Sequence, residues 1–296
     1  PKNLEKLKKA IHMLNSPKLK NLFDRFQPDI VACSQAFPCG MVADYKKTYQ
    51  SNLPLIAVLT DFVPHDYWIY DTINAYVVPS QEIGDRLVQK GIPQEKIKPF
   101  GIPFDPKFNI PVAKEPVLAS LGLAENATTI LIMGGGQGLG PIQTILDSLN
   151  LVSGNVQYII ITGTNKKLFN VLQKKVKTFP RKTALLPFAS NVNELMAAAD
   201  IIITKPGGIT TAEALTKHLP MIIVQPIPGQ EENNTRFLTQ KKAALRVEDP
   251  STIHEAIEQL LRDPQQLNTM RACAAAISKP HASHDIAKLL LGTCCV

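Results

Sequence analysis

The sequence lacks several features that mark special classes of protein. Its five cysteines form no C-x-x-C pair, and this odd, scattered set fits reduced thiols in a cytosolic protein better than a disulfide framework. No apolar run approaches the roughly 18–20 residues that span a bilayer, and no signal-peptide core is visible. There is no solenoid repeat, no low-complexity segment and no His/Cys/Asp spacing that suits a metal. Any contact with a membrane is therefore expected from the surface.

Length and charge favour two domains with one basic face. The 296 residues are about twice the length of a typical domain, and 45% apolar with 19% charged residues excludes intrinsic disorder. The net charge of +7 is uneven, because residues 1–20 hold six Lys and one Glu, which leaves only +2 for the rest. This pattern indicates one anionic contact face and not a chain-wide nucleic-acid footprint.

The chain begins inside a basic amphipathic pattern. Residues 4–14 place apolar side chains at helical spacing and turn Lys6, Lys8 and Lys9 elsewhere. Because the first residue is Pro1 and the pattern is already under way, we expect that an upstream segment has been removed.

Short apolar strands alternate with helices along the rest of the chain. Continuous apolar strands in β-α-β order predict an α/β protein with parallel sheets covered on both faces. Prolines in 109–116 suggest a linker, so we expect a partial domain over 1–112, a complete doubly wound domain over 113–279 and a last helix over 280–296 that packs back on the first domain. The expected strands are 30–33, 55–59, 75–78, 97–100, 129–133, 157–161, 183–186, 200–204 and 221–224.

A glycine-rich loop, Gly134–Gly140, follows a buried strand and opens a helix. Backbone without Cβ atoms can approach a phosphate there, and the helix dipole favours negative charge. The alternative is a plain tight turn. It is not a P-loop, because no Gly-Lys-Ser/Thr follows, and the next strand ends without the acid that holds an NAD ribose.

Two further expected strands are followed by segments with polar residues and glycines. In Lys205-Pro206-Gly207-Gly208-Ile209-Thr210, two glycines precede a helix N-terminus, with Glu213 one turn in. Together with the first loop this suggests a shared diphosphate and a carboxylate that grips a ribose, although Glu213 alone could be a helix-dipole partner. The segment 228–234 is rich in amides and carboxylates, which suits either a sugar's hydroxyls or an exposed helix start.

In the first half, Thr60-Asp61-Phe62 and His65 follow a buried strand, with Tyr67 and Trp68 close behind. A carboxylate or imidazole there can act as a general base, while a solitary His is often structural. The aromatic pair is also typical of a surface that meets apolar matter.

These motifs, in this order, resemble the GT-B glycosyltransferases of the processive diacylglycerol glucosyltransferase and monogalactosyldiacylglycerol synthase group. The resemblance runs from about residue 27 to 240 and is strongest in Lys205–Thr210 and in Pro228-Gly229-Gln230-Glu231. It implies two Rossmann-like domains facing a cleft, the first of them incomplete here.

The resemblance also implies roles for individual residues. The donor is a UDP-hexose, which needs no metal or other cofactor, and the acceptor is a diacylglycerol-type lipid. Transfer inverts the anomeric carbon, and Asp61 and His65 are the remaining candidates for the base or an acceptor contact. The implied donor-binding residues are Gly135, Gly136, Gln137, Phe188, Ala189, Gly207, Gly208, Thr210, Glu213, Gln230, Glu231 and Asn234.

The family begins with a glycine-rich loop ending in His, which this sequence lacks, so the chain by itself is expected to need that segment for activity. The enzyme would be cytoplasmic and peripheral at the inner face of the cell membrane. Its membrane contacts would be Lys6, Lys8, Lys9, Tyr67 and Trp68.

Three other functions stay open. One is an N-acetylglucosaminyl transferase acting on a lipid-linked cell-wall precursor, which shares the layout. A second is a UDP-sugar epimerase, and a third is a regulator that binds a UDP-sugar without transferring it.

Overall fold

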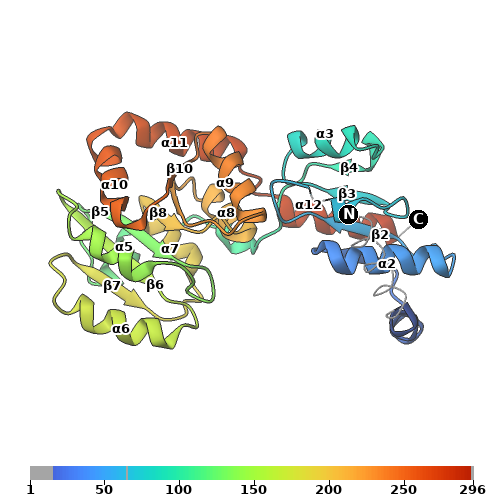
Figure 1. Ribbon diagram of the computed structural model, residues 1–296, viewed down its shortest axis with the longest axis horizontal. Coiled ribbons are helices and arrows are strands. Elements are labelled where there is room, and N and C mark those ends of the chain that lie inside the picture. Colours follow the sequence, from blue (N-terminus) through green and yellow to red (C-terminus); the bar gives the residue numbers. More distant parts are fainter. Residues whose placement is uncertain (1–15, 65, 295–296) are drawn as a thin grey trace. The chain divides into compact units, whose positions relative to one another are not determined.

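The computed structural model describes residues 16–64 and 66–294 and divides the chain into two compact units (Figure 1). The first unit runs to Pro103 and takes in the chain again from His281, and the second is Phe104–Pro280. The division falls earlier than the 112/113 boundary that the prolines suggested. Residues just after Pro103 already belong to the second unit, because Phe108 is buried and Lys217 Nζ donates to the Ile110 carbonyl oxygen at 3.0 Å.

The first unit holds a four-stranded parallel sheet in the order β1-β2-β3-β4. Its elements are β1 (Val31–Cys33), α2 (Ala36–Thr48), β2 (Leu55–Val58), η1 (Asp66–Trp68), β3 (Ala75–Val77), α3 (Gln81–Gln89), η2 (Gln94–Lys96), β4 (Ile97–Lys98) and α12 (Ala282–Cys294). A further helix covers residues 16–26.

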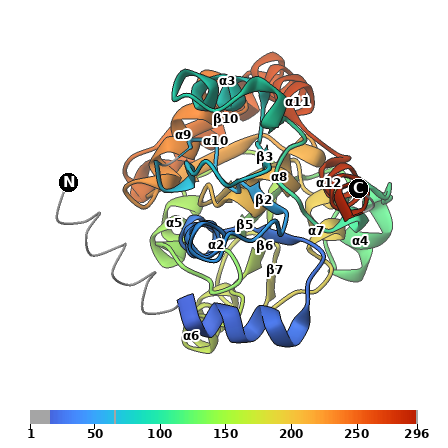
Figure 2. The same ribbon diagram turned by 90° about the vertical axis from the view of Figure 1, so that its right-hand side faces the viewer.

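Both faces of this sheet are covered, as its continuous apolar strands require. Leu55 and Ala57 point to the face that packs against α2, α3 and η1. Their neighbours Ile56 and Val58 point to the other face, where Ile286 of α12 packs on them. The last helix of the chain therefore completes the core of the first unit, and Figure 2 shows it beside this sheet.

The second unit is a six-stranded parallel sheet in the order β10-β9-β8-β5-β6-β7. The chain runs outward from β5 to β7, returns to β8 beside β5, and runs outward again to β10, which is the doubly wound pattern. Its elements are η3 (Pro106–Asn109), α4 (Lys114–Ser120), β5 (Thr128–Met133), α5 (Ile142–Leu149), β6 (Val156–Ile161), α6 (Lys166–Val176), β7 (Thr183–Leu186), α7 (Val192–Ala198), β8 (Ile201–Thr204), α8 (Gly208–Thr216), β9 (Met221–Val224), α9 (Gln230–Gln240), β10 (Ala244–Val247), η4 (Pro250–Thr252), α10 (Ile253–Arg262) and α11 (Pro264–Ile277).

The core of the second unit follows from the two-residue period of its strands. Ile130, Ile160 and Ile203 lie on one face and pack against apolar side chains of α5, α6 and α10. The residues between them, such as Leu131 and Ile202, are buried on the opposite face. Each central strand therefore buries side chains on both faces, and polar chemistry is confined to the strand ends.

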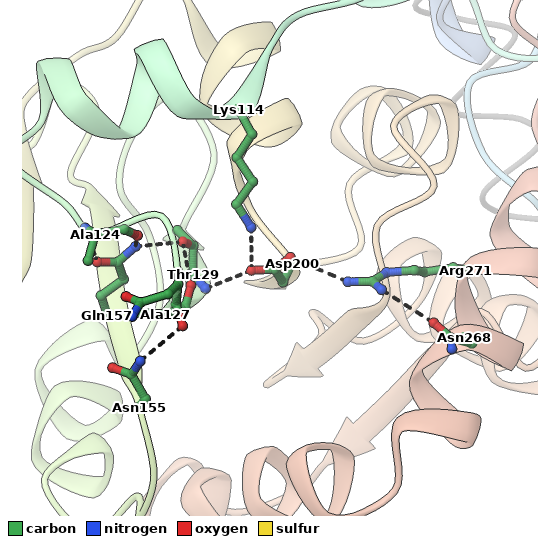
Figure 3. A network of polar contacts seen from close by, with 10 residues as sticks. Lys114, Ala124, Ala127, Thr129, Asn155, Gln157, Asp200, Asn268 and Arg271 are labelled. Carbon is green, nitrogen blue, oxygen red and sulfur yellow. Dashed lines mark hydrogen bonds and ion pairs between the residues drawn. The ribbon is translucent and has the colours of Figure 1, made fainter.

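A polar network closes the amino-terminal edge of this sheet (Figure 3). Asp200, at the start of β8, accepts from the Thr129 backbone N–H at 2.8 Å and pairs with Lys114 Nζ at 2.7 Å. Arg271 of α11 approaches the other carboxylate oxygen at 3.4 Å. The carboxylate thus joins α4, β5, β8 and α11.

Two helix ends of the sheets' connections differ in how they are capped. Ser80 caps α3, because its hydroxyl accepts from the Ile83 N–H. Asn191 is the N-cap residue of α7, but its side-chain amide donates to the Glu194 carboxylate at 2.9 Å and, within the described residues, accepts no backbone N–H. Strand β10 escaped the sequence analysis, because only its two end residues are buried and its apolar run is short.

Within residues 16–64 and 66–294, no helix is both long enough and apolar enough to cross a bilayer.

Removing the Asp200 carboxylate should destabilise the second unit. Asp200→Ala leaves the Thr129 N–H and the Lys114 ammonium without their partner, and we expect a loss of about 2 kcal/mol in urea unfolding followed by circular dichroism. The matched control is Asp147→Ala, whose carboxylate pairs with Lys175 on the surface and is 59% exposed. That change should cost less than about 0.5 kcal/mol, and equal losses would contradict the role assigned to the network.

Candidate functional site

The candidate site lies where the winding of the second sheet reverses. Strands β5 and β8 are neighbours, and the chain leaves their carboxyl ends in opposite directions, which opens a crevice that binds ligands in doubly wound folds. A small pocket at this point has a mostly apolar lining, and it is bordered by Leu139 and Gly140 after β5 and by Thr204, the last residue of β8, with Lys205 next to it. The structure thus brings together the two glycine-bearing turns that the sequence singled out.

The glycine loop after β5 needs its glycines for backbone reasons. Gly135, Gly138 and Gly140 all have positive φ, and a Cβ on Gly138 would lie 2.0 Å from the Thr162 carbonyl oxygen. The Leu139 N–H donates to the Gly134 carbonyl at 2.9 Å, and the Thr164 N–H donates to the Gly136 carbonyl at 2.9 Å. The loop is therefore folded back on itself and tied to the turn after β6.

Two glycines have no such structural need. Gly136 and Gly207 have negative φ, and a Cβ at either position would meet nothing within 4 Å. The space beside these two backbone positions is open, so a diphosphate could approach them closely.

Helix α8 begins at this site with Gly207 as its N-cap and Gly208 as its first residue. The first N–H groups of a helix have no partner within it and favour an anion. In the same turn the Thr211 hydroxyl is fully buried and lacks a hydrogen-bond partner among the described residues. Thr210 lies beside it and is half-buried.

Glu213 lies one turn further along α8 and is mostly enclosed. Burial raises the pKa of Glu213 to about 7; the positive charge of Lys107 opposes this shift, and the negative charge of Asp105 adds to it. A carboxyl group whose pKa lies this close to neutral pH is typical of a functional position. Burying its charged form costs free energy unless a ligand compensates, so the position is better explained by a ligand.

Helix α9 presents the amide- and carboxylate-rich segment. Gly229 precedes it with φ of 100°, and Gln230 is exposed at its start. One carboxylate oxygen of Glu231 accepts from the Ile227 N–H at 2.7 Å. Asn234 is 1% exposed and donates to the Pro206 carbonyl at 2.9 Å, so it ties α9 to the turn before α8. A sugar-binding role for these three residues stays a prediction.

The loop after β7 presents Phe188 and Ala189. The Phe188 ring is 63% exposed, although most large apolar side chains of this unit are buried. Next to it, the Ser190 carbonyl oxygen accepts from Lys107 Nζ at 3.1 Å. Gln137, the remaining expected donor contact, is exposed in the glycine loop.

The first unit holds the other expected site residues. Asp61 follows β2 and is half-buried, while His65, Lys6, Lys8 and Lys9 lie outside the described residues. Tyr67 is half-buried in η1.

Trp68 does not lie on a surface. Its indole is 4% exposed and packs in the core with α2 and α3, which contradicts its expected place at a membrane. Burying a large apolar ring in this core is more favourable in free energy than leaving it exposed to water.

Sequence reasoning missed Lys107 and Asp105. They stand outside every motif, in a short Asp-Pro-Lys-Phe segment, and only the folding of η3 against α7 and α8 brings them to the site. Among the described residues, no group of three His, Cys, Asp or Glu side chains could hold a metal ion.

The architecture and the site define a class of protein. Two parallel sheets, the second doubly wound with glycine turns at its switch point, form the GT-B fold of UDP-sugar enzymes. The structure is similar to MurG of Acinetobacter baumannii, with a TM-score of 0.69 and 15% identity over 94% of this chain and 77% of that one. It is also similar to MnaA of S. aureus, solved with UDP, with a TM-score of 0.69 and 14% identity over 97% of this chain and 82% of that one.

The chain itself belongs to the glycosyltransferase family of monogalactosyldiacylglycerol synthases and processive diacylglycerol glucosyltransferases. Residues 2–104 match the monogalactosyldiacylglycerol (MGDG) synthase model, and residues 129–290 match the glycosyltransferase family 28 C-terminal domain. It is 31% identical to a processive diacylglycerol beta-glucosyltransferase of Bacillus pumilus over 92% of this chain and 71% of that protein. It is 32% identical to the one of Bacillus cereus strain B4264 over 93% and 70%.

Two alanine substitutions in the glycine loop should separate folding from binding. Gly136→Ala fits the fold, so its thermal stability should equal that of the parent protein. It should nevertheless weaken UDP binding in calorimetry by about tenfold, because a methyl group blocks the approach of a phosphate.

Gly138→Ala should instead lower stability by about 1–3 kcal/mol, because its Cβ collides with the Thr162 carbonyl at a positive φ. Unchanged UDP affinity in Gly136→Ala, with the fold intact, would remove the loop from the donor site.

Proposed function

We propose that this protein transfers a hexose from a UDP-sugar to the hydroxyl of a diacylglycerol-type lipid and inverts the anomeric carbon. The observation that carries the proposal is the meeting of two glycine-bearing turns at the switch point, with the half-buried carboxyl of Glu213 on the helix that follows one of them. The proposal is supported by family membership, because the relatives are named diacylglycerol glucosyltransferases.

The donor binds to the second unit, and each of its parts meets residues that suit its chemistry. Its diphosphate lies between the glycine loop and the first turn of α8, where open backbone at Gly136 and Gly207 meets free N–H groups. The ribose diol donates to Glu213, and the uracil meets backbone at Phe188 and Ala189. The hexose faces the start of α9.

The transfer is a single displacement. A base removes the proton of the lipid hydroxyl, its oxygen attacks the anomeric carbon from the face opposite UDP, and the bond between that carbon and the phosphate oxygen breaks. Asp61 and His65 are the candidates for the base or for an acceptor contact. The N-terminus of α8 stabilises the negative charge that develops on UDP, so the proposed step requires no metal ion.

Incubation of the full-length protein with diacylglycerol vesicles and a UDP-sugar tests this function. UDP-glucose, UDP-galactose and UDP-N-acetylglucosamine should be compared, with and without EDTA. We expect a glycolipid from one of the hexose donors and no loss in EDTA. Transfer only to a lipid-linked cell-wall precursor, formation of an epimer, or tight donor binding without any product would each replace the proposed activity with one of its alternatives.

We further propose that the protein is cytoplasmic and docks peripherally on the inner face of the cell membrane through the helix of residues 16–26, drawn in blue in Figure 2. Lys18, Leu22, Arg25 and Phe26 are spaced to share one face of this helix, and all four are exposed. Phe26 is 74% exposed, which is unusual for a large apolar ring.

The other side of this helix is fixed to the protein. Phe23 packs edge-on against Tyr45 of α2 with ring centroids 4.9 Å apart, and it borders the core of the first unit. The helix therefore presents its apolar and cationic side chains outward, which suits an anionic lipid surface. These residues, and not Trp68, are the proposed membrane contacts.

The double variant Leu22→Ser/Phe26→Ser should reduce binding to phosphatidylglycerol vesicles by about tenfold in a sedimentation assay, because both side chains lose apolar burial in the bilayer. Raised salt should weaken the binding that remains, since Lys18 and Arg25 still act. The control is Leu151→Ser, which removes from the second unit an apolar side chain whose exposure, 61%, lies between those of Leu22 and Phe26. Equal binding by the double variant and the parent would refute the docking face.

A further inference from the structure

We propose that Lys107 is a positioning residue for the nucleoside half of the donor: its ammonium holds the loop after β7 and, paired with Asp105 on the segment that packs against α8, sets the charge environment of Glu213. This inference rests on the proposed function, in which Glu213 accepts the ribose hydroxyls. It adds two residues that no motif contains and a pH dependence for donor binding.

The short segment that carries these residues is firmly placed. Phe104 and Phe108 flank it, both buried, with their rings edge to face and 6.2 Å apart. The Asp105 carboxylate accepts from the Lys107 N–H at 3.0 Å, which caps η3. Because η3 lies against α7 and α8, its side chains reach the loop after β7 and the second turn of α8.

Lys107 first acts on the uracil side. Its ammonium donates to the Ser190 carbonyl oxygen at 3.1 Å, and Ser190 directly follows Phe188 and Ala189. The surrounding loop is largely exposed, so this charge-assisted hydrogen bond fixes the direction of a peptide next to the backbone that meets the base.

Lys107 then acts on the ribose side, together with Asp105. The two side chains lie 3.3 Å apart, and their opposite charges act on the enclosed Glu213 carboxyl in opposite directions. Burial makes the carboxyl of Glu213 titrate near neutral pH, so a small change in the local field changes its charge at working pH.

The charged side chains on the helix packed against α8 and at the end of α8 have partners elsewhere. Helix α11 carries Arg271, which pairs with Asp200 and Asn268, and Cys273. Lys217, just beyond the end of α8, donates to the Ile110 carbonyl. Lys107 and Asp105 are therefore the charged pair whose opposite charges act on Glu213 from the neighbouring segment η3.

The ionisation state matters because the ribose diol donates two hydrogen bonds. A carboxylate accepts both, whereas a protonated carboxyl loses acceptor capacity. With a pKa of about 7 for Glu213, donor affinity should fall as the pH drops through that value and stay constant above it.

The test is the affinity of UDP-glucose and UDP-galactose between about pH 5.5 and 8.5 for the parent protein and three variants, measured by calorimetry. A UDP-sugar is used because its diphosphate is a diester, which does not titrate in this range. Lys107→Met should move the midpoint of the affinity loss to higher pH and weaken binding at neutral pH by about threefold to tenfold. Lys107→Arg should retain the parent profile.

Asp105→Asn is the matched opposite. The amide oxygen still caps η3, so only the charge is lost, and the midpoint should move to lower pH. Glu213→Gln should bind weakly and without pH dependence. If Lys107→Met weakens binding equally at every pH, or if the Lys107 and Asp105 variants shift the midpoint in the same direction or not at all, the inference is wrong.

These outcomes separate two failures. If Glu213→Gln binds as tightly as the parent, Glu213 does not hold the ribose and the proposed donor site fails. If Glu213→Gln loses affinity while the Lys107 and Asp105 variants keep the parent profile, only the inference about these two residues fails.

Discussion

The structure depends on one constraint, namely that a parallel sheet built from continuous apolar strands must be covered on both faces. In the second unit, helices from every β-α connection cover it, and the buried strands leave only their ends for polar groups. In the first unit, the final helix of the chain supplies part of the cover, since Ile286 packs on Ile56 and Val58. Stability and site position follow from the same requirement, because loops can hold ligands only where strands end.

Where the structure describes the chain, polar groups are paired at one edge of the second sheet and left unpaired or desolvated at the other. At the amino-terminal edge, Asp200 is held by a backbone N–H and by Lys114, so its buried charge is paired. At the carboxyl edge, the Thr211 hydroxyl is buried without a partner in the part of the chain that the structure describes, and burial disfavours the ionised form of Glu213, which raises its pKa. Such groups destabilise an empty protein and are stabilised by a ligand, which is the usual relation between stability and function.

Charge at the site comes from a segment outside the doubly wound sheet. Lys107 lies on η3 and Asp105 caps it, before the first strand of the unit, yet η3 packs against α8, which carries Glu213. Sequence motifs located the glycine turns and Glu213, because these depend on short local strings, and the family resemblance assigned them to the donor. The Lys107 contact depends on how η3 packs. A segment this short shows no hydrophobic periodicity from which its position could be predicted.

The sequence by itself determined the parallel α/β class, most strands and the two glycine turns, because hydrophobic period and glycine chemistry act over a few neighbouring residues. Tertiary structure alone decided that β5 and β8 are neighbours, that Trp68 is core, and that Asn234 ties α9 to Pro206. It also packed η3, which carries Lys107, against α8, which carries Glu213. The physical reason is that burial and electrostatic environment are properties of packed neighbours, which local patterns do not specify.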